Sequence, residues 1–132
     1  MIFSVHVLAP PYSQQANLTA LHFCQAVLRQ GHQLKRVFFS GDGVLTASQL
    51  GVPPQDEINL YQEWVKLGAE SQVELVLCIS ACLRRGMVNA SEADRYQLPA
   101  HNLNPQFIVA GLGQLVDAAL DSDRLVTFGG NG

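Results

Sequence analysis

Short runs of apolar and β-branched residues alternate along the chain with segments in which apolar residues recur every three or four positions. Runs of this kind, closed by proline, glycine or polar residues, are typical of strands buried in a sheet. The run at 73–79 carries a cysteine near its end and is followed by a short basic segment. The runs predict strands at 2–8, 33–40, 73–79 and 124–128, and a weak strand, or the lead into a helix, at 107–110.

The segments between the runs predict helices. The first ends at Gly31, the second begins at a cap formed by Asp56 and ends near Gly68, and the third occupies 111–120. Their apolar positions are Leu18, Leu21, Cys24, Val27 and Leu28; Ile58, Leu60, Tyr61, Trp64, Val65 and Leu67; and Leu112, Leu115, Val116 and Leu120. The other expected elements are a short helix or ordered loop at 44–50, a helical turn at 82–85, a helix at 91–96 whose first residue is Ser91, a loop at 98–104 and a flexible tail at 129–132.

Strands that alternate with helices imply βαβ units, in which successive strands run parallel. The sequence therefore predicts an α/β fold, a three-layer sandwich with a mostly parallel sheet of about five strands and helices on both faces. A chain of 132 residues is long enough to bury one core. Residues 1–132 are accordingly expected to form a single domain.

The composition narrows the range of partners. Apolar residues make up 48% of the chain and charged residues only 14%, so we expect a partner to cover part of the surface. A net charge of −3 provides no basic surface for a nucleic-acid backbone, which argues against direct binding of RNA or DNA. The sequence shows neither an apolar stretch long enough to cross a membrane nor the basic start of a signal peptide, so we expect a cytoplasmic protein.

Several kinds of site lack their usual sequence signals. The first strand leads into Ala9-Pro10-Pro11-Tyr12, which has no glycine to bring backbone amides to a phosphate, and Gly111-x-Gly113 alone is a weak signal. No Gly-x-Ser-x-Gly elbow is present. We therefore expect no metal and no organic cofactor. The four histidines, none at ligand spacing, are interpreted as core or edge residues (His6, His22), a turn residue (His32) and a loop residue (His101).

The thiols are the remaining candidates for chemistry. Cys78 is expected at the carboxyl end of the third strand, the edge where parallel sheets carry their functional groups. Backbone amides of the following helical turn, with Arg84 and Arg85, would favour its thiolate. A thiolate there can accept the outer sulfur of a donor persulfide and pass it to another thiol. Cys24 is interpreted as a core residue.

Alternatives stay open for Cys78, Cys82 and the two arginines. An equally weighted interpretation of Cys78 is a buried strand-end thiol without chemistry, and Cys82 either resolves a persulfide or simply packs. The arginines are either solvated charges that cap a short helix, the reading preferred for Arg85, or a docking patch for acidic partners.

A set of short motifs occurs in a particular order over essentially the full chain. They are Pro11-Tyr12-x-Gln14-Gln15, Phe23-x-Gln25-Ala26, Gly31-His32-x-Leu34-x-x-Val37-Phe38-Phe39, Asp42-Gly43-Val44, Cys78 followed by Leu83-Arg84-Arg85-Gly86, and Asp123-Arg124-Leu125-Val126. In order and spacing they resemble the DsrE/TusD family of small sulfur-relay proteins. Cys82 is not part of that family's pattern.

The resemblance implies a sulfurtransferase that carries sulfur as a persulfide on Cys78. It also implies a hetero-hexamer with two smaller homologous subunits, TusB-like and TusC-like, a TusA-like sulfur donor and a TusE-like acceptor. The implied pathway is 2-thiolation of the tRNA wobble uridine. Closely similar DsrE subunits serve sulfur oxidation instead, and that alternative stays open.

Two further hypotheses belong to other classes of protein. The chain could be a non-catalytic assembly subunit whose thiol is buried. It could also be a small-molecule binding domain with a pocket near residues 41–44.

Overall fold

The computed structural model describes residues 1–130, in which strands and helices alternate as predicted. Of the predicted tail at 129–132, residues 131 and 132 lie outside the described residues. The elements are β1 (Ile2–Val7), α1 (Gln15–Arg29), β2 (Gln33–Phe39), the 3-10 helix η1 (Gly41–Ala47), α2 (Leu60–Ser71), β3 (Glu74–Cys78), α3 (Ile79–Arg84), α4 (Ala90–Arg95), β4 (Phe107–Ala110), α5 (Gly113–Asp121) and β5 (Arg124–Phe128).

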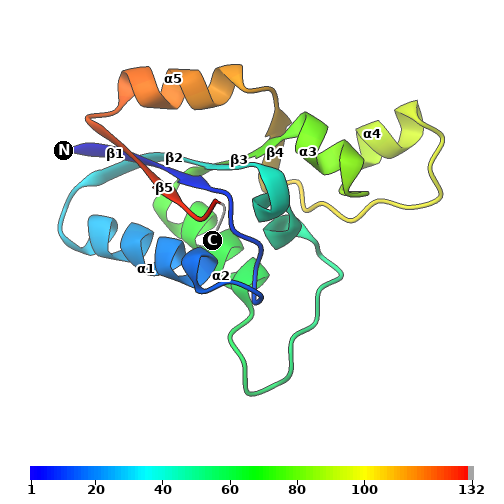
Figure 1. The fold of residues 1–132 in the computed structure, drawn as a ribbon, viewed down its shortest axis with the longest axis horizontal. Helices are drawn as coiled ribbons and strands as arrows, with labels where there is room; N and C mark the ends of the chain where they lie inside the picture. The colour runs from blue at the N-terminus through cyan, green and yellow to red at the C-terminus, as the bar shows by residue number, and fades with distance from the viewer. Residues whose placement is uncertain (131–132) are drawn as a thin grey trace.

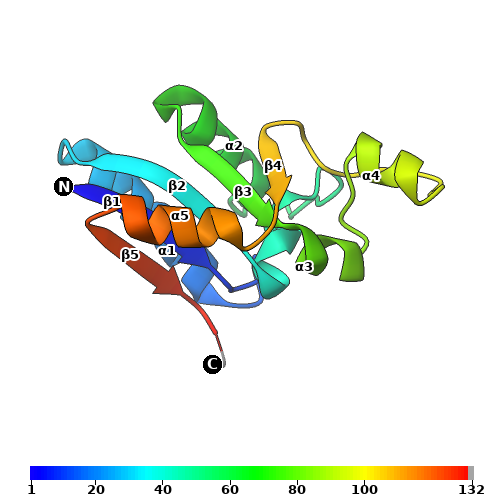
Figure 2. The same ribbon diagram turned by 90° about the horizontal axis from the view of Figure 1, so that it is seen from above.

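The five strands form one parallel sheet in the order β4-β3-β2-β1-β5. Helices α1 and α2 cover one face of the sheet, and α5 lies over the other (Figure 1). Seen from above, α5 crosses β1 and β2, whereas α3 and α4 lie beyond the end of β3 (Figure 2). The predicted three-layer α/β fold with a five-stranded sheet is therefore confirmed.

The main core lies between the sheet and helices α1 and α2. Leu75 and Leu77 of β3 are fully buried on this side, and Val76 between them faces the other side of the sheet and is 1% exposed, as their unbroken apolar run predicted. Phe39 at the end of β2 meets Trp64 of α2 edge-to-face, with ring centroids 5.2 Å apart. Burying side chains of this size contributes about 1.5–3 kcal/mol each, so this layer dominates the stability of the fold.

Asn17 of α1 is a fully buried polar residue that connects three parts of the chain. Its amide nitrogen donates to the Ala9 carbonyl at 3.1 Å and to Thr46 Oγ1 at 2.8 Å. Its Oδ1 accepts a hydrogen bond from Trp64 Nε1 at 3.1 Å. Because every polar atom of this amide has a partner, it holds η1 and α2 in place without the cost of an unpaired buried group.

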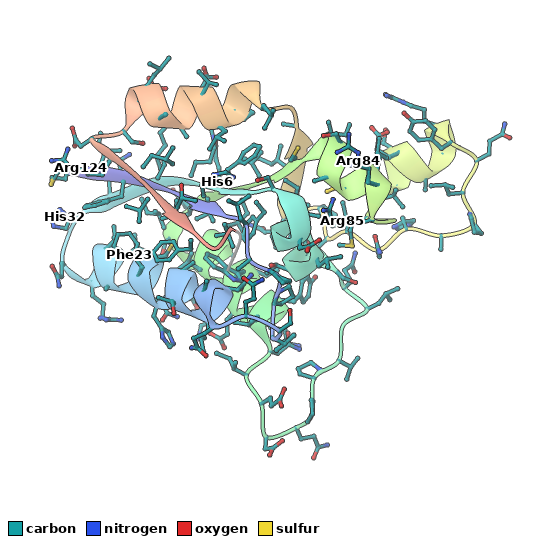
Figure 3. The ribbon with its side chains drawn as sticks, viewed as in Figure 1. His6, Phe23, His32, Arg84, Arg85 and Arg124 are labelled. Atoms are coloured by element: carbon teal, nitrogen blue, oxygen red, sulfur yellow. The ribbon has the colours of Figure 1, made fainter. Side chains whose placement is uncertain are left out.

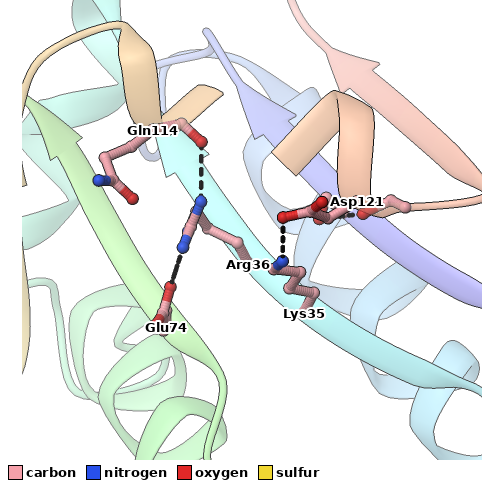
Figure 4. A network of polar contacts seen from close by, with 7 residues as sticks. Lys35, Arg36, Glu74, Gln114 and Asp121 are labelled. Atoms are coloured by element: carbon pink, nitrogen blue, oxygen red, sulfur yellow. Dashed lines mark hydrogen bonds and ion pairs between the residues drawn. The ribbon is translucent and has the colours of Figure 1, made fainter. Parts of the chain in front are cut away.

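The face of the sheet under α5 carries charged residues as well as apolar ones (Figure 4). Arg36 of β2 is 7% exposed and donates to the carboxylate of Glu74 on β3, its Nε lying 2.7 Å from Oε2. Its Nη1 donates to the Gln114 carbonyl of α5 at 2.9 Å. Lys35 pairs with Asp121 near the other end of α5 at 2.6 Å. These contacts fasten α5 to the sheet at both ends.

Two predicted helix caps are wrong. Asp56 does not begin α2, because Asn59 does, accepting a hydrogen bond from the backbone N–H three residues on at 3.1 Å. Ser91 likewise lies inside α4, whose cap is Asn89, with the equivalent bond at 2.8 Å. In both cases the asparagine side chain accepts a hydrogen bond from a free backbone amide of the first turn. Asp56 is left in the loop before α2, and Ser91 lies within α4.

Other boundaries also move. The segment predicted at 44–50 is the 3-10 helix Gly41–Ala47, and the predicted turn at 82–85 is the helix Ile79–Arg84. The helix predicted to end near Gly68 is α2, which continues to Ser71. Gly68 does not end the helix but allows it to pack closely against β3. A Cβ at Gly68 would lie 2.9 Å from a methyl carbon of Leu75.

The helix predicted at 111–120 forms, but most of its apolar positions do not pack inward. Leu112, Val116 and Leu120 are 59%, 56% and 77% exposed, whereas Leu115 is partly buried and Ala118 fully buried. Periodicity identified the helix correctly, but here it marks an outward apolar stripe as well as an inner face.

Candidate functional site

Cys78 is the last residue of β3, at the carboxyl edge of the sheet where the sequence predicted it. It pairs with Ala110 on β4, and its backbone is extended before the chain turns into α3. Cys78 is 6% exposed, whereas Cys24 and Cys82 are both 0% exposed. All three cysteines are therefore buried, and Cys78 is the least completely buried of them.

The immediate polar contact of the Cys78 thiol is a neighbouring hydroxyl. Its Sγ lies 3.4 Å from Ser80 Oγ, and either atom can be the donor. Although Cys78 occupies the cap position of α3, its side chain accepts no hydrogen bond from the helix backbone. The expected influence of the helix amides on the thiol therefore involves no hydrogen bond, and the thiol is hydrogen-bonded to the Ser80 hydroxyl instead.

The two arginines after Cys78 have different surroundings (Figure 3). Arg85 Nε donates to Asp42 Oδ1 at 2.8 Å, and its Nη1 donates to the Ala81 carbonyl at 3.1 Å. It caps α3, as the preferred interpretation held, and also ties that helix to η1. Arg84 is exposed. Arg84 is therefore the better candidate for a docking charge, and Arg85 holds the helix that follows Cys78.

The other two thiols are buried in ways that suppress their chemistry. Burial raises the pKa of the Cys82 thiol to about 12, the nearby Cys78 adds to the rise, and Arg85 opposes it. Burial also raises the pKa of Cys24. Because the thiolate is the reactive form, neither is a competent nucleophile near neutral pH. Packing, one of the two readings of Cys82, is the one its surroundings favour.

A second pair of side chains near the carboxyl edge was missed from the sequence. His6 of β1 places Nε2 2.6 Å from the hydroxyl of Ser40, the residue after β2. Burial lowers the pKa of His6, which favours the neutral ring. Ser40 follows a strand just as Cys78 ends one, so the rule that singled out Cys78 also applies to it.

The remaining histidines lie apart from this edge. His22 is exposed on α1, so its interpretation as a core or edge residue is wrong. His32 Nδ1 lies 3.0 Å from the amino terminus, and His101 is exposed in a loop. Within residues 1–130, no group of three His, Cys, Asp or Glu side chains is placed to hold a metal ion.

The segment 41–44, considered as a pocket, is packed against the end of β1. Val44 is fully buried, and a Cβ added to Gly43 would lie 2.2 Å from the Val7 carbonyl oxygen. Only glycine permits this approach. The segment therefore closes the edge of the sheet beside Cys78.

No helix in the described part of the chain is both long and apolar enough to cross a membrane.

The structure thus defines a parallel α/β protein with a cysteine at the carboxyl edge of its sheet. The family model of the DsrE/DsrF-like family matches residues 1–128. The chain belongs to this family.

Named relatives agree with that assignment. Sulfurtransferase TusD of Serratia proteamaculans is 48% identical over 122 residues, covering 92% of this chain and 95% of the relative. A protein named DsrE from Allochromatium vinosum is 42% identical over 129 residues, covering 98% and 99%. The crystal structure of the E. coli ychN protein superposes with a TM-score of 0.74 at 22% identity, covering 96% of this chain and 97% of that one, which shows the common fold.

Proposed function

We propose that the chain is a sulfurtransferase subunit in which Cys78 is the nucleophile and carries sulfur as a persulfide. The observation that carries the proposal is the position of Cys78 at the edge of the sheet where parallel α/β proteins place their chemistry. At 6% exposure it is also the least completely buried of the three cysteines. Relatives up to 48% identical that bear the name sulfurtransferase support the reaction class.

The reaction needs only thiol chemistry. The Cys78 thiolate attacks the outer sulfur of a donor persulfide, so a bond forms between Sγ and that sulfur. The sulfur–sulfur bond of the donor breaks, and its electron pair leaves with the donor thiolate, which then takes a proton from water. An acceptor thiolate later repeats the attack on the carried sulfur and regenerates Cys78. No net oxidation occurs, so no redox cofactor is required.

The relay also needs partners. We propose that residues 1–132 act as one unit of a cytoplasmic hetero-hexamer with TusB-like and TusC-like subunits, a TusA-like donor and a TusE-like acceptor. The outward stripe of Leu112, Val116 and Leu120 on α5 supports a covered face, since apolar side chains on one side of a helix favour burial against another protein. The proposed destination of the sulfur is the tRNA wobble uridine, as the resemblance of the sequence motifs to the DsrE/TusD family implies.

Two alternative functions each have an observation in their favour. A role in sulfur oxidation is favoured by the relative named DsrE, whose alignment with this chain covers 98% of its length. A non-catalytic role in assembly is favoured by the 6% exposure of Cys78, which leaves a donor little room. The location of transferred sulfur separates the assembly role from the relay.

The test is mass spectrometry of the native complex after incubation with a persulfide-loaded donor. We expect one added sulfur, which peptide mapping locates on Cys78. Cys78→Ser should abolish the gain while the complex stays intact, and Cys82→Ser is the matched control that should still accept sulfur. Unchanged loading of Cys78→Ser, or an unloaded wild type beside a loaded donor, would contradict the proposal and favour assembly.

A further inference from the structure

Ser40 lies beside Cys78 on the neighbouring strand. β2 and β3 are paired with Phe38 opposite Val76 and Phe39 opposite Leu77. One step further in the same register brings Ser40 level with Cys78. Both residues have extended backbones, so each continues the line of its strand to the edge. Neighbouring strands lie about 4.8 Å apart, which sets the scale of the gap between the two residues.

The side chains of Ser40 and Cys78 project from the same face of the sheet. Alternate residues of a strand share a face, so Ser40 shares that of Phe38 and Cys78 that of Val76. His6 is paired with Phe38 and lies on this face too, with its ring centroid 5.9 Å from that of Phe38. His6 therefore reaches Ser40 along the sheet, from the side opposite to Cys78.

The Ser40 hydroxyl is held in place but retains hydrogen-bonding capacity. The Ser40 N–H donates to the Val7 carbonyl at 3.1 Å, and the Ser40 carbonyl accepts from the Gly43 N–H at 3.0 Å. Its hydroxyl has one donor and two acceptor sites, of which His6 occupies one. When His6 Nε2 carries the proton and donates, the hydroxyl proton of Ser40 is free for another acceptor.

We propose that Ser40, oriented by His6, donates a hydrogen bond to the outer sulfur of the Cys78 persulfide. The inference rests on the proposed function and adds to it the group that recognises the carried sulfur. A persulfide places that sulfur about 2.05 Å beyond Sγ, across part of the gap to the next strand. The His6 N–H donates to the Ser40 oxygen, and the Ser40 O–H donates to the sulfur anion, a charge-assisted bond strengthened by its neighbour.

The two serines near Cys78 then serve different states of the thiol. Ser80 contacts Sγ itself at 3.4 Å in the unloaded protein. In that state the Ser40 hydroxyl is hydrogen-bonded to His6. Only after Cys78 is loaded does this hydroxyl gain the outer sulfur as a second hydrogen-bond partner. Removing the Ser40 hydroxyl should therefore destabilise the loaded form relative to the unloaded one.

The experiment measures how sulfur distributes between glutathione persulfide and Cys78 in the native complex. At equilibrium in excess glutathione, intact mass gives the loaded fraction and hence the exchange constant. We expect Ser40→Ala to lower this constant about tenfold, because one charge-assisted hydrogen bond is lost. Ser40→Thr, which keeps a hydroxyl on an extended backbone, should restore it to within about twofold. Ser4→Ala is the matched control, because it removes a buried serine hydroxyl of β1 that lies level with Glu74, the first residue of β3, and it should stay within about twofold of the wild type.

His6→Phe tests the orienting role, since it keeps a flat ring but removes the N–H. We expect a smaller fall, about threefold, with Ser40 still present. A wild-type constant in Ser40→Ala, or equal losses in Ser40→Ala and Ser40→Thr, would overturn the inference while leaving Cys78 as the carrier. A wild type that takes up no sulfur on Cys78 would overturn the proposed function and the inference with it.

Discussion

Arg85, which caps α3, and Asp42 of η1 form an ion pair at 2.8 Å, joining two segments 43 residues apart in the sequence. The first follows the strand that ends in Cys78, and the second follows Ser40. The Arg85 side chain is 29% exposed and that of Asp42 58% exposed, so water weakens the attraction between the charges. The pair therefore contributes more to the position of α3 than to the stability of the fold.

Asp42→Asn should change the free energy of unfolding in urea by no more than about 1 kcal/mol, as is usual for exposed ion pairs. The same variant should lower the rate of sulfur acceptance by Cys78 severalfold, because α3 loses its tie to η1. Asp56→Asn, which removes an exposed carboxylate from the loop before α2, is the control for the loss of one negative charge. If it slowed acceptance as much as Asp42→Asn does, charge rather than position would be the cause.

Two adjacent residues of β2 allow a comparison between an ion pair with a buried cation and one in which both partners are more exposed. Arg36 is 7% exposed and pairs with Glu74 while donating to the Gln114 carbonyl. The Lys35 side chain is 29% exposed and pairs with Asp121. Arg36→Met should lower the free energy of unfolding by about 2 kcal/mol, since hydrogen bonds of a charged group are lost and a carbonyl is left unpaired.

Lys35→Met is the matched control and should cost no more than about 1 kcal/mol. Chemical denaturation of both variants gives the comparison, and hydrogen exchange in α5 tests whether Arg36 fastens that helix. Equal losses in the free energy of unfolding of the two variants would show that the burial of Arg36 does not increase the contribution of its polar contacts to stability.

Cys82 should make the protein less stable in alkali. Its thiol ionises near the ordinary pKa of 9.0 in the unfolded chain and near about 12 when buried. The folded state therefore favours the protonated thiol, and this contribution is complete below pH 9.0 and is lost as the pH rises toward 12. Cys24, with a pKa that burial also raises, acts in the same direction.

Urea unfolding at about pH 8 and about pH 10.5 measures this loss. Cys82→Ala should cost stability at the lower pH, because a buried side chain is truncated, but should show a smaller further loss at the higher pH than the wild type. Parallel losses in the two proteins would mean that Cys82 does not titrate on unfolding in this range.

The sequence predicted the sheet and the place of Cys78 because both depend on local patterns. An apolar run such as 73–79 signals a buried strand, and the end of such a strand has a known position in a parallel sheet. Contacts across the fold carry no such signal. The Arg85–Asp42 pair and the contact between His6 and Ser40, 34 residues apart, depend on strand order, which periodicity does not reveal.

The caps and α5 show two other limits. Asp56 and Asn59 are both good capping residues, and the choice between them depends on which side chain reaches the first turn in the folded chain. In α5, apolar residues at helical spacing predicted the helix but not which of them face the sheet. A stripe that packs on a partner has the same period as one that packs on the core.

The stripe on α5 leads to the last prediction. Replacing Leu112, Val116 and Leu120 together by serine should change the free energy of unfolding of the isolated chain little, because these side chains are 59%, 56% and 77% exposed. The same variant should lose the large complex, since the apolar contact that covers α5 is gone. Light scattering during gel filtration of the native complex measures the assembly. Asp117→Ser, an exposed change on α5 away from the stripe, should leave its mass unchanged. A full-sized complex with the triple variant would place the partner surface elsewhere on the protein.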